Sequence, residues 1–229
     1  VEKMFVHLQG FINPDHNPFD ELIITSEFEA SNLEISILKN GINERVPFPY
    51  LDGEGIWQKS TLNYEINGVL WDGSIQSNFV INVPNGLAGS FSGTINSETK
   101  LEGLNLSSVK LSLLDDWMPI TGIAKGSIKL QGQIGEATSI LKKYGQLYIS
   151  DFSLDSGTPI SLSHTKLNIQ QNTPQQTLAR IQIENIMFDQ ILIKAIDANL
   201  KILPEKFLLT NGRLNPSNGI ILFSGNYHT

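Results

Sequence analysis

The segment LNLSSVKLSL, residues 104–113, returns 56 positions later as ISLSHTKLNI, residues 160–169. Both copies alternate apolar and polar residues, as a half-buried β-strand does. Most positions keep their polarity, and four are identical: Leu106 and Leu162, Ser107 and Ser163, Lys110 and Lys166, Leu111 and Leu167. A duplicated strand of this kind predicts a repetitive β architecture.

The alternation changes at the same place in both copies. Apolar residues stand at 104 and 106 and then at 109, 111 and 113, and in the second copy at 160 and 162 and then at 167 and 169. Because side chains alternate between the two faces of a strand, such a change predicts an extra residue. We therefore expect a β-bulge or a break near Ser107/Ser108 and near Ser163/His164.

Period-two alternation recurs in residues 32–37, 61–66, 74–83, 126–131 and 180–184. Turn residues separate these segments at Asn13-Pro14, Asp52-Gly53, Asp72-Gly73, Pro84-Asn85-Gly86, Asn211-Gly212 and Asn215-Pro216. The spacing predicts a mostly antiparallel meander, since parallel strands would need more crossover helices than the pattern offers. We expect a single continuous β segment over residues 1–229.

Two short helices are expected beside the strands. Residues 136–144 place Ala137, Ile140, Leu141 and Tyr144 on one helical face, and Gly145 follows as a C-terminal cap. Residues 114–119 have room for one more helical turn, which Pro119 would end.

Composition excludes several classes of protein. With 229 residues and 40% hydrophobic content, the chain can build a real core. It has no cysteine, so disulfides and thiolate sites are excluded. A net charge of -7 and the absence of a basic run argue against nucleic-acid binding. The longest apolar runs are about five residues, whereas a membrane-spanning helix needs about 20. Because the chain begins at Val1 without a signal pattern, we interpret it as a piece of a longer protein whose anchor lies elsewhere.

Motifs of catalysis are not found. A nucleophile elbow needs Ser at the centre of Gly-x-Ser-x-Gly, but residues 89–93 have Phe91 there. Gly53-Glu54-Gly55 lacks the third glycine and the helix of a dinucleotide-binding fingerprint. The four histidines have no metal-ligand spacing: His7, His16, His164 and His228. A cluster of Asp15, His16 and Asp20 is better interpreted as a polar turn. We expect no enzyme activity, no metal and no cofactor.

Other chemistry-bearing residues also favour structural roles. Asp115 and Asp116 could be drawn as a glycosidase pair, but adjacent carboxylates favour a solvated turn or helix start. Trp57, Trp71 and Trp117 could stack on sugars, but packing is favoured. Lys110 and Lys166 stand on the expected outward face.

Residues 101–229 resemble the repetitive β domains of the AsmA-like superfamily, the AsmA/TamB-type envelope proteins. LEGLNLSSVKLSLLDDWMPITG (101–122) is similar to the family's apolar strand, short turn or helix, Pro and then Gly. GIAKGSIKLQGQI (122–134) and YGQLYISDFSL (144–154) are similar to the strands that follow. ISLSHTKLNI and NGRLNPSNGIILFSGNY (211–227) resemble the continuation, a strand and a hairpin.

The resemblance implies an elongated, folded-over, taco-like open β-sheet with an apolar concave groove. It also implies a periplasmic protein, anchored to the inner membrane by a segment outside this chain, with partner proteins at both membranes. Such proteins carry phospholipids toward the outer membrane or assist its assembly. The expected ligand is therefore the phospholipid acyl chain.

The residue pattern supports such a groove independently of the family. Apolar residues that alternate along a strand must be covered by a second sheet, by closure or by a ligand. The residues expected to line the groove are Ile75, Phe79, Ile81, Phe91, Ile95, Ile128, Leu130, Ile181, Ile183, Leu200, Ile202 and Phe223. The alternative is a β-sandwich or β-solenoid interaction module that binds protein or carbohydrate and has a closed, dry core.

Overall fold

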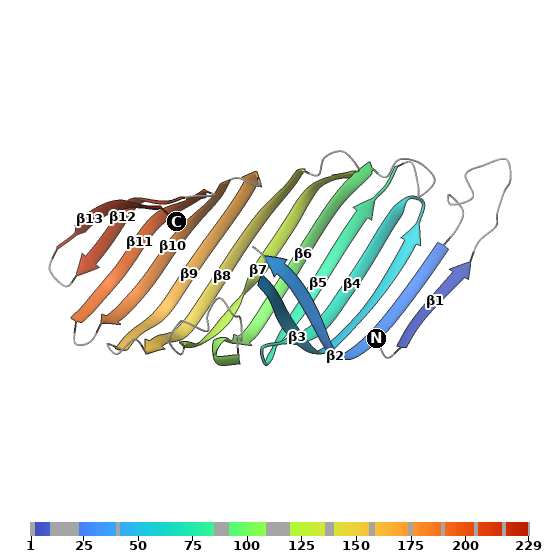
Figure 1. Cartoon of the computed structure of the whole chain (residues 1–229), viewed down its shortest axis with the longest axis horizontal. Helices are drawn as coiled ribbons and strands as arrows, with labels where there is room; N and C mark the ends of the chain where they lie inside the picture. The colour runs from blue at the N-terminus through green and yellow to red at the C-terminus, as the bar shows by residue number, and fades with distance from the viewer. Residues whose placement is uncertain are drawn as a thin grey trace. The chain divides into compact units, whose positions relative to one another are not determined.

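The computed structural model describes residues 3–9, 23–39, 42–84, 92–108, 120–135, 140–155, 159–173, 176–188, 191–203, 206–216 and 219–228. Nearly all of these residues lie in β-strands, which Figure 1 shows in chain order. A single turn of 3₁₀-helix, η2 (Leu106–Ser108), follows the sixth strand. The strands are β1 (Lys3–Gln9), β2 (Ile23–Lys39), β3 (Ile42–Gln58), β4 (Thr61–Leu70), β5 (Gly73–Asn82), β6 (Ser92–Asn105), β7 (Ile120–Gly135), β8 (Ile140–Asp155), β9 (Pro159–Thr173), β10 (Gln176–Phe188), β11 (Ile191–Leu203), β12 (Lys206–Pro216) and β13 (Ile221–His228).

Each strand pairs with its neighbour in sequence, so the sheet order runs from β1 to β13 without a crossover. The pairing is antiparallel from β1 to β4 and from β8 to β13. The two end strands are not paired to each other, so the sheet is open. The prediction of an all-β, antiparallel, open sheet is therefore confirmed. The residues cluster into a first unit (Val1–Leu70, Ser74–Lys100, Lys129–Lys142) and a second unit (Trp71–Gly73, Leu101–Ile128, Lys143–Thr229).

Two tight hairpins place non-glycine residues in the left-handed region. Lys59 and Ser60 have φ of 50° and 71°, and Trp71 and Asp72 have φ of 47° and 63°. Two consecutive positive φ values match the right-handed twist of the flanking strands. The turn expected at Asp72-Gly73 therefore lies one residue earlier in the chain.

The turns expected at Asp52-Gly53 and Asn211-Gly212 are wrong, because both pairs lie inside strands, β3 and β12. The glycines serve close packing there instead. A Cβ at Gly53 would stand 2.5 Å from the Phe28 ring, and one at Gly212 would stand 2.5 Å from the Phe223 ring. Glycine in a strand often marks such a close approach.

The helix expected at residues 136–144 is also wrong where the structure describes it. β8 begins at Ile140, and Lys143 and Tyr144 pair with Gln171 and Gln170 of β9. A nine-residue helix is marginal by itself, so the hydrogen bonds that β9 offers decide the conformation. Residues 136–139, and residues 114–119 with their expected helical turn, lie outside the described part of the chain.

The two copies of the repeat differ in structure. The first copy starts at Leu104, and β6 ends at the next residue, Asn105. The 3₁₀ turn η2 follows, so the break near Ser107/Ser108 is confirmed. The second copy stays within β9, where Leu162 pairs with Ile186 and His164 pairs with Glu184. These pairs keep one register across Ser163, so the extra residue expected there is wrong.

Few side chains in this sheet are fully buried. The hydrophobic residues below about a tenth exposure number twelve among the described residues, and Val83 is the one large side chain that is fully covered. The other hydrophobic side chains whose burial is described keep part of their surface accessible to solvent.

Candidate functional site

The first unit carries an apolar face on β5 that alternates strictly. Ile75, Ser77, Phe79 and Ile81 are half-buried, whereas Gln76, Asn78 and Val80 between them are exposed. Val80, between the last two, is 40% exposed and points to the opposite face. The structure therefore places these three predicted residues together on one side of the sheet.

Three aromatic rings lie side by side on this face. The ring of Tyr64 in β4 stacks on Phe79 at 5.3 Å between centroids and on Phe28 of β2 at 6.2 Å. The intervening strand β3 presents Gly53 and Gly55 beneath the rings, and a Cβ on either would collide with Tyr64. The two glycines thus leave the space that the Tyr64 ring occupies. We did not predict Phe28 or Tyr64 from the sequence, although the Gly-x-Gly spacing opposite them was the available signal.

The second unit has an apolar face on β10 and β11. Ile181 pairs with Leu167 of β9 and with Ala198 of β11, and Ile183 pairs with Ile196. The predicted residues Leu200 and Ile202 follow on β11 and pair with Ala179 and Thr177. Ala179 and Ala198 are buried, whereas the larger side chains are half-buried. These four predicted residues share one face.

The other predicted residues that the structure describes lie on three further strands. Ile95 and Leu130 are half-buried on β6 and β7, and Ile128 is 48% exposed. Phe223 of β13 pairs with Gly212, and its ring covers that glycine. Phe91 lies outside the described residues.

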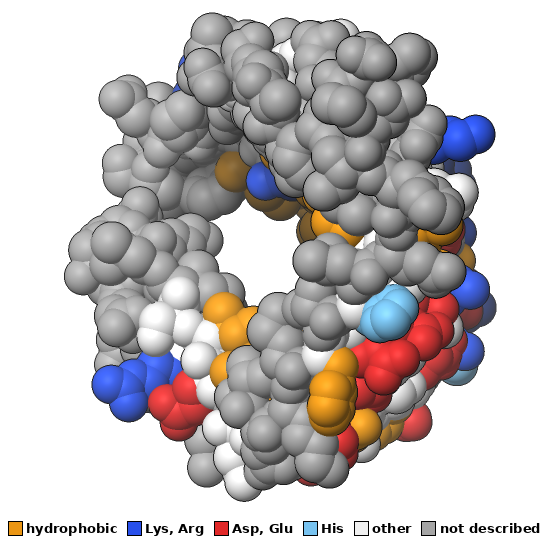
Figure 2. Space-filling model, turned by 90° about the vertical axis from the view of Figure 1, so that its right-hand side faces the viewer, with side chains coloured by type: hydrophobic (Ala, Val, Ile, Leu, Met, Phe, Trp, Pro, Cys, Tyr) orange, Lys and Arg blue, Asp and Glu red, His pale blue; other side chains and the backbone are white. Residues whose placement is uncertain are grey.

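The apolar face of the first unit is open to solvent in part. Ile75, Phe79 and Ile81 keep part of their surface accessible, and Figure 2 shows acidic side chains gathered on the outer surface. Half-buried Ile, Leu and Phe side chains remain in contact with water, which is unfavourable at about 25 cal/mol for each Å². A partner that covers these side chains would therefore bind favourably.

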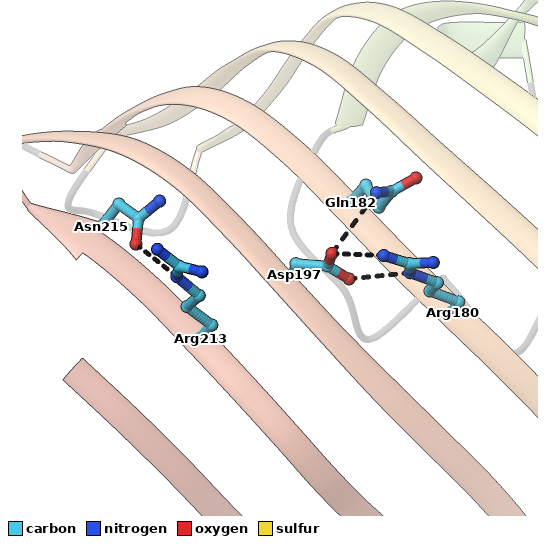
Figure 3. Close-up of polar contacts among 5 residues, drawn as sticks. All are labelled: Arg180, Gln182, Asp197, Arg213 and Asn215. Carbon is cyan, nitrogen blue, oxygen red and sulfur yellow. Dashed lines mark hydrogen bonds and ion pairs between the residues drawn. The ribbon is translucent and has the colours of Figure 1, made fainter. Parts of the chain in front are cut away.

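In the second unit, the face opposite the apolar one carries hydrogen-bonded polar side chains. Asp197 of β11 accepts two hydrogen bonds from Arg180 of β10, 3.0 Å from Nε and 2.7 Å from the terminal nitrogen (Figure 3). Gln182 donates a weaker bond to Asp197 at 3.4 Å, and Arg213 donates to Asn215 at 3.1 Å. Hydrogen bonding to Arg180, together with its charge, lowers the pKa of Asp197 although partial burial opposes this. The contacts of Asp197 therefore join the polar sides of β10 and β11, whereas the Arg213–Asn215 bond lies within β12.

Three depressions in the described residues are lined mostly by side chains of the polar face. The first, about 520 Å³, lies in the second unit, and the second, about 510 Å³, lies over β2 to β5 of the first unit. The third, about 660 Å³, includes His164 and Lys166. Lys166 stands 5.3 Å above the Tyr148 ring, so its expected outward position is confirmed.

Two polar atoms are buried without a partner in the described residues. They are Trp57 Nε1 and Thr165 Oγ1. Trp57 pairs with Ile24 and Leu62, and it is 8% exposed, so it packs in the core of the first unit. An unpaired buried donor or hydroxyl is costly. Thr165 stands between Ile149 and Ile183 on the apolar face.

The described residues offer no group of three metal-ligating side chains. His7 and His164 are exposed, whereas His16 lies outside the described residues and nothing is described of the His228 side chain. Asp15, Asp20, Lys110, Asp115, Asp116 and Trp117 also fall outside them. In the part of the chain that the structure describes, no helix is long and apolar enough to cross a membrane.

Comparison with known proteins adds no relative. No family model, no curated protein and no solved structure matches this chain. The class of protein is therefore defined by its own geometry: an open antiparallel sheet with one polar face and one partly uncovered apolar face.

Proposed function

We propose that this chain is a non-catalytic lipid-binding segment whose apolar face shields acyl chains during transport. The observation that supports the proposal is the half-exposed apolar face of the one sheet that the described strands form. Monomeric proteins rarely expose extended apolar patches unless the patches bind something. An acyl chain suits such a face because it needs no polar partner.

Energetics favours a flexible apolar ligand. Each buried CH₂ contributes about 0.8 kcal/mol, so a chain lying across several strands gains affinity from many small contacts. The stacked rings of Phe28, Tyr64 and Phe79 present a continuous apolar strip in the first unit. The charged headgroup would remain at the rim in contact with water, so transport along this face needs no catalytic residue.

The resemblance to AsmA/TamB-type proteins adds the biological setting to the proposal. The chain would lie in the periplasm of a bacterial envelope and conduct phospholipid between the inner and outer membranes, in the course of outer-membrane biogenesis. Partner proteins at both membranes would contact neighbouring segments.

Photo-crosslinking in cells tests the proposal. A photoreactive residue is placed at Phe79, Ile128 or Ile181, and the adducts are identified by mass spectrometry. Val80 is the matched control, because it neighbours Phe79, is apolar and points to the opposite face. Lys129, which forms an ion pair with Glu98 at 3.4 Å, is a second control on the polar face.

Phospholipid adducts at the three apolar positions and not at the controls would support lipid binding. Equal adducts at Phe79 and Val80 would indicate non-specific contact with membranes. Adducts with protein, or none at any apolar position, would contradict the proposal.

A carbohydrate-binding module is the second candidate, and the depression of about 520 Å³ on the polar face favours it. The depression is lined by apolar side chains, which suit the face of a sugar ring, and by amide and guanidinium groups, which suit its hydroxyls. These residues are Tyr144, Leu178, Leu208, Asn168, Asn199 and Arg180. Titration with a set of envelope glycans tests this role. Binding that Asn199→Ala abolishes would favour it over lipid transport.

A further inference from the structure

Four strands share a four-residue motif: an apolar residue, a polar residue, a residue with left-handed backbone, and a second apolar residue. The third residue is Asn32, Gly103, Asp151 or Asn185, with φ of 52°, 67°, 52° and 51°. Because only Gly, Asn and Asp enter this region readily, the residue type and the conformation agree. The motifs are Ala30-Ser31-Asn32-Leu33 in β2, Leu101-Glu102-Gly103-Leu104 in β6, Ile149-Ser150-Asp151-Phe152 in β8 and Ile183-Glu184-Asn185-Ile186 in β10.

In each motif both apolar residues turn away from solvent, and the left-handed residue is exposed. In β10, Ile183 is half-buried and Ile186 is 5% exposed, whereas Glu184, Asn185 and Met187 are exposed. In a regular strand, residues three apart point to opposite faces. The motif therefore places residues i and i+3 on the same face and reverses the alternation.

The reversal occurs at the same level in adjacent strands. Ile149 pairs with Thr165 of β9, and Thr165 pairs with Ile183. On the other side of the left-handed residues, Phe152 pairs with Leu162, and Leu162 pairs with Ile186. Strand β9 has the same spacing, Leu162-Ser163-His164-Thr165, and its register is unbroken. Two rows therefore face the same side, one fully apolar and one interrupted by Thr165.

The first unit uses the same device. Ala30 pairs with Leu51, and Leu33 pairs with Phe48. Two apolar residues three positions apart on β2 therefore lie opposite two apolar residues three positions apart on β3. Ala30, Leu51 and Phe48 are all buried. The motif is thus present within each of the two units by itself.

We propose that this motif, apolar–polar–Asn/Asp/Gly–apolar with a left-handed third residue, keeps the apolar face continuous along strands of more than ten residues. Without it, the alternation would send Phe152, Leu162 and Ile186 to the polar face, and the apolar face would end halfway along β8 to β10. The inference concerns the protein itself and holds whichever ligand covers the face. Asp151 and Asn185 are therefore positioning residues of the apolar face.

Thiol labelling tests the inference, because the chain has no cysteine of its own. Single cysteines are introduced as Ile186→Cys or Met187→Cys, and their reaction rates with a soluble maleimide are compared without lipid. In the parent chain we expect Met187→Cys to react several-fold faster than Ile186→Cys. The same order is expected with Asn185→Gly, which keeps the left-handed backbone accessible.

Asn185→Val should change this order, since a β-branched residue disfavours the left-handed region. Regular alternation would then move residue 186 to the polar face, and the ratio of the two rates should fall several-fold or invert. Ala198→Cys, at a position that is 3% exposed, reports whether the sheet stays folded. If the valine variant loses this protection, Asn185→Ala supplies the same comparison with less strain.

An unchanged ratio in a folded valine variant would overturn the inference, as would an altered ratio with Asn185→Gly. Faster labelling at residue 186 than at 187 in the parent chain would also overturn it. None of these results depends on lipid, so they are independent of the crosslinking test of the proposed function.

Discussion

The ring of Tyr64 occupies the space that a Cβ on Gly55 of the neighbouring strand would take. Tyr64 is also the middle ring of the stack with Phe28 and Phe79. The glycine and the ring therefore depend on each other: the glycine admits the ring, and the ring covers backbone that the glycine leaves bare.

Gly55→Ala should destabilise the fold by about 1 kcal/mol. Overpacking against the Tyr64 ring costs roughly 1–3 kcal/mol, and the lower entropy of the unfolded chain offsets about 0.4–1 kcal/mol of it. Urea denaturation measures the difference. Gly225→Ala is the control, since no atom lies within 4 Å of its added Cβ, and it should be neutral or slightly stabilising. Equal effects at both glycines would contradict the ring contact.

Thr165→Val should stabilise the protein by about 1 kcal/mol, because it removes a buried hydroxyl without a partner and keeps the side-chain volume. Thr99→Val should do the opposite, since the Thr99 hydroxyl hydrogen-bonds Ser77 Oγ at 2.9 Å. The midpoints of chemical denaturation give both values. Destabilisation by Thr165→Val would mean that its hydroxyl has a partner in solution.

Asp197 should contribute stability at neutral pH that is lost in acid. Its folded pKa lies below the ordinary value of 3.8, so the contribution is present above that value and disappears as the pH falls through the lower folded pKa. The effect is small, since both side chains are exposed and screened by solvent. Thermal unfolding from neutral to acidic pH should therefore show a shallower acid loss for Asp197→Asn than for the parent. Arg180→Gln should show the same flattening, and an unchanged pH profile in both variants would contradict the pairing.

Phe79→Asp should weaken the uptake of a fluorescent fatty acid by about tenfold or more, because 1.4 kcal/mol lost from apolar contact and carboxylate desolvation already changes affinity tenfold. Val80→Asp, on the opposite face, should leave uptake nearly unchanged. The comparison holds the introduced charge constant and varies only the face. Equal loss in both variants would indicate destabilisation rather than loss of a lipid contact.

Much of the fold could be predicted from alternation. The strict pattern of β5 requires one face to be apolar, so Ile75, Phe79 and Ile81 were assigned to one side correctly. On β10 and β11 the same reasoning placed Ile181, Ile183, Leu200 and Ile202 together. Alternation is local, and the residue types of each strand carry it completely.

The errors arose where distant strands decide the conformation. Residues 140–144 have helical spacing, but they lie in β8, where Lys143 and Tyr144 pair with β9. Gly53 and Gly212 resemble turn residues, yet aromatic rings from neighbouring strands occupy the space above them. Neither cause is visible in the local sequence, because each partner stands many residues away.

The sequence by itself determined that this chain is a repetitive, antiparallel β protein with one apolar side, because alternating polarity dictates which side chains share a face of a strand. It also revealed the change of alternation near Ser163, although not its cause. Only the tertiary structure decided that the register continues there while Asp151 and Asn185 adopt left-handed backbone beside it. It also decided that the described strands form one open sheet whose larger apolar side chains are mostly half-buried. Register and covering depend on which strands meet in space, and pairing between strands is a property of the whole sheet.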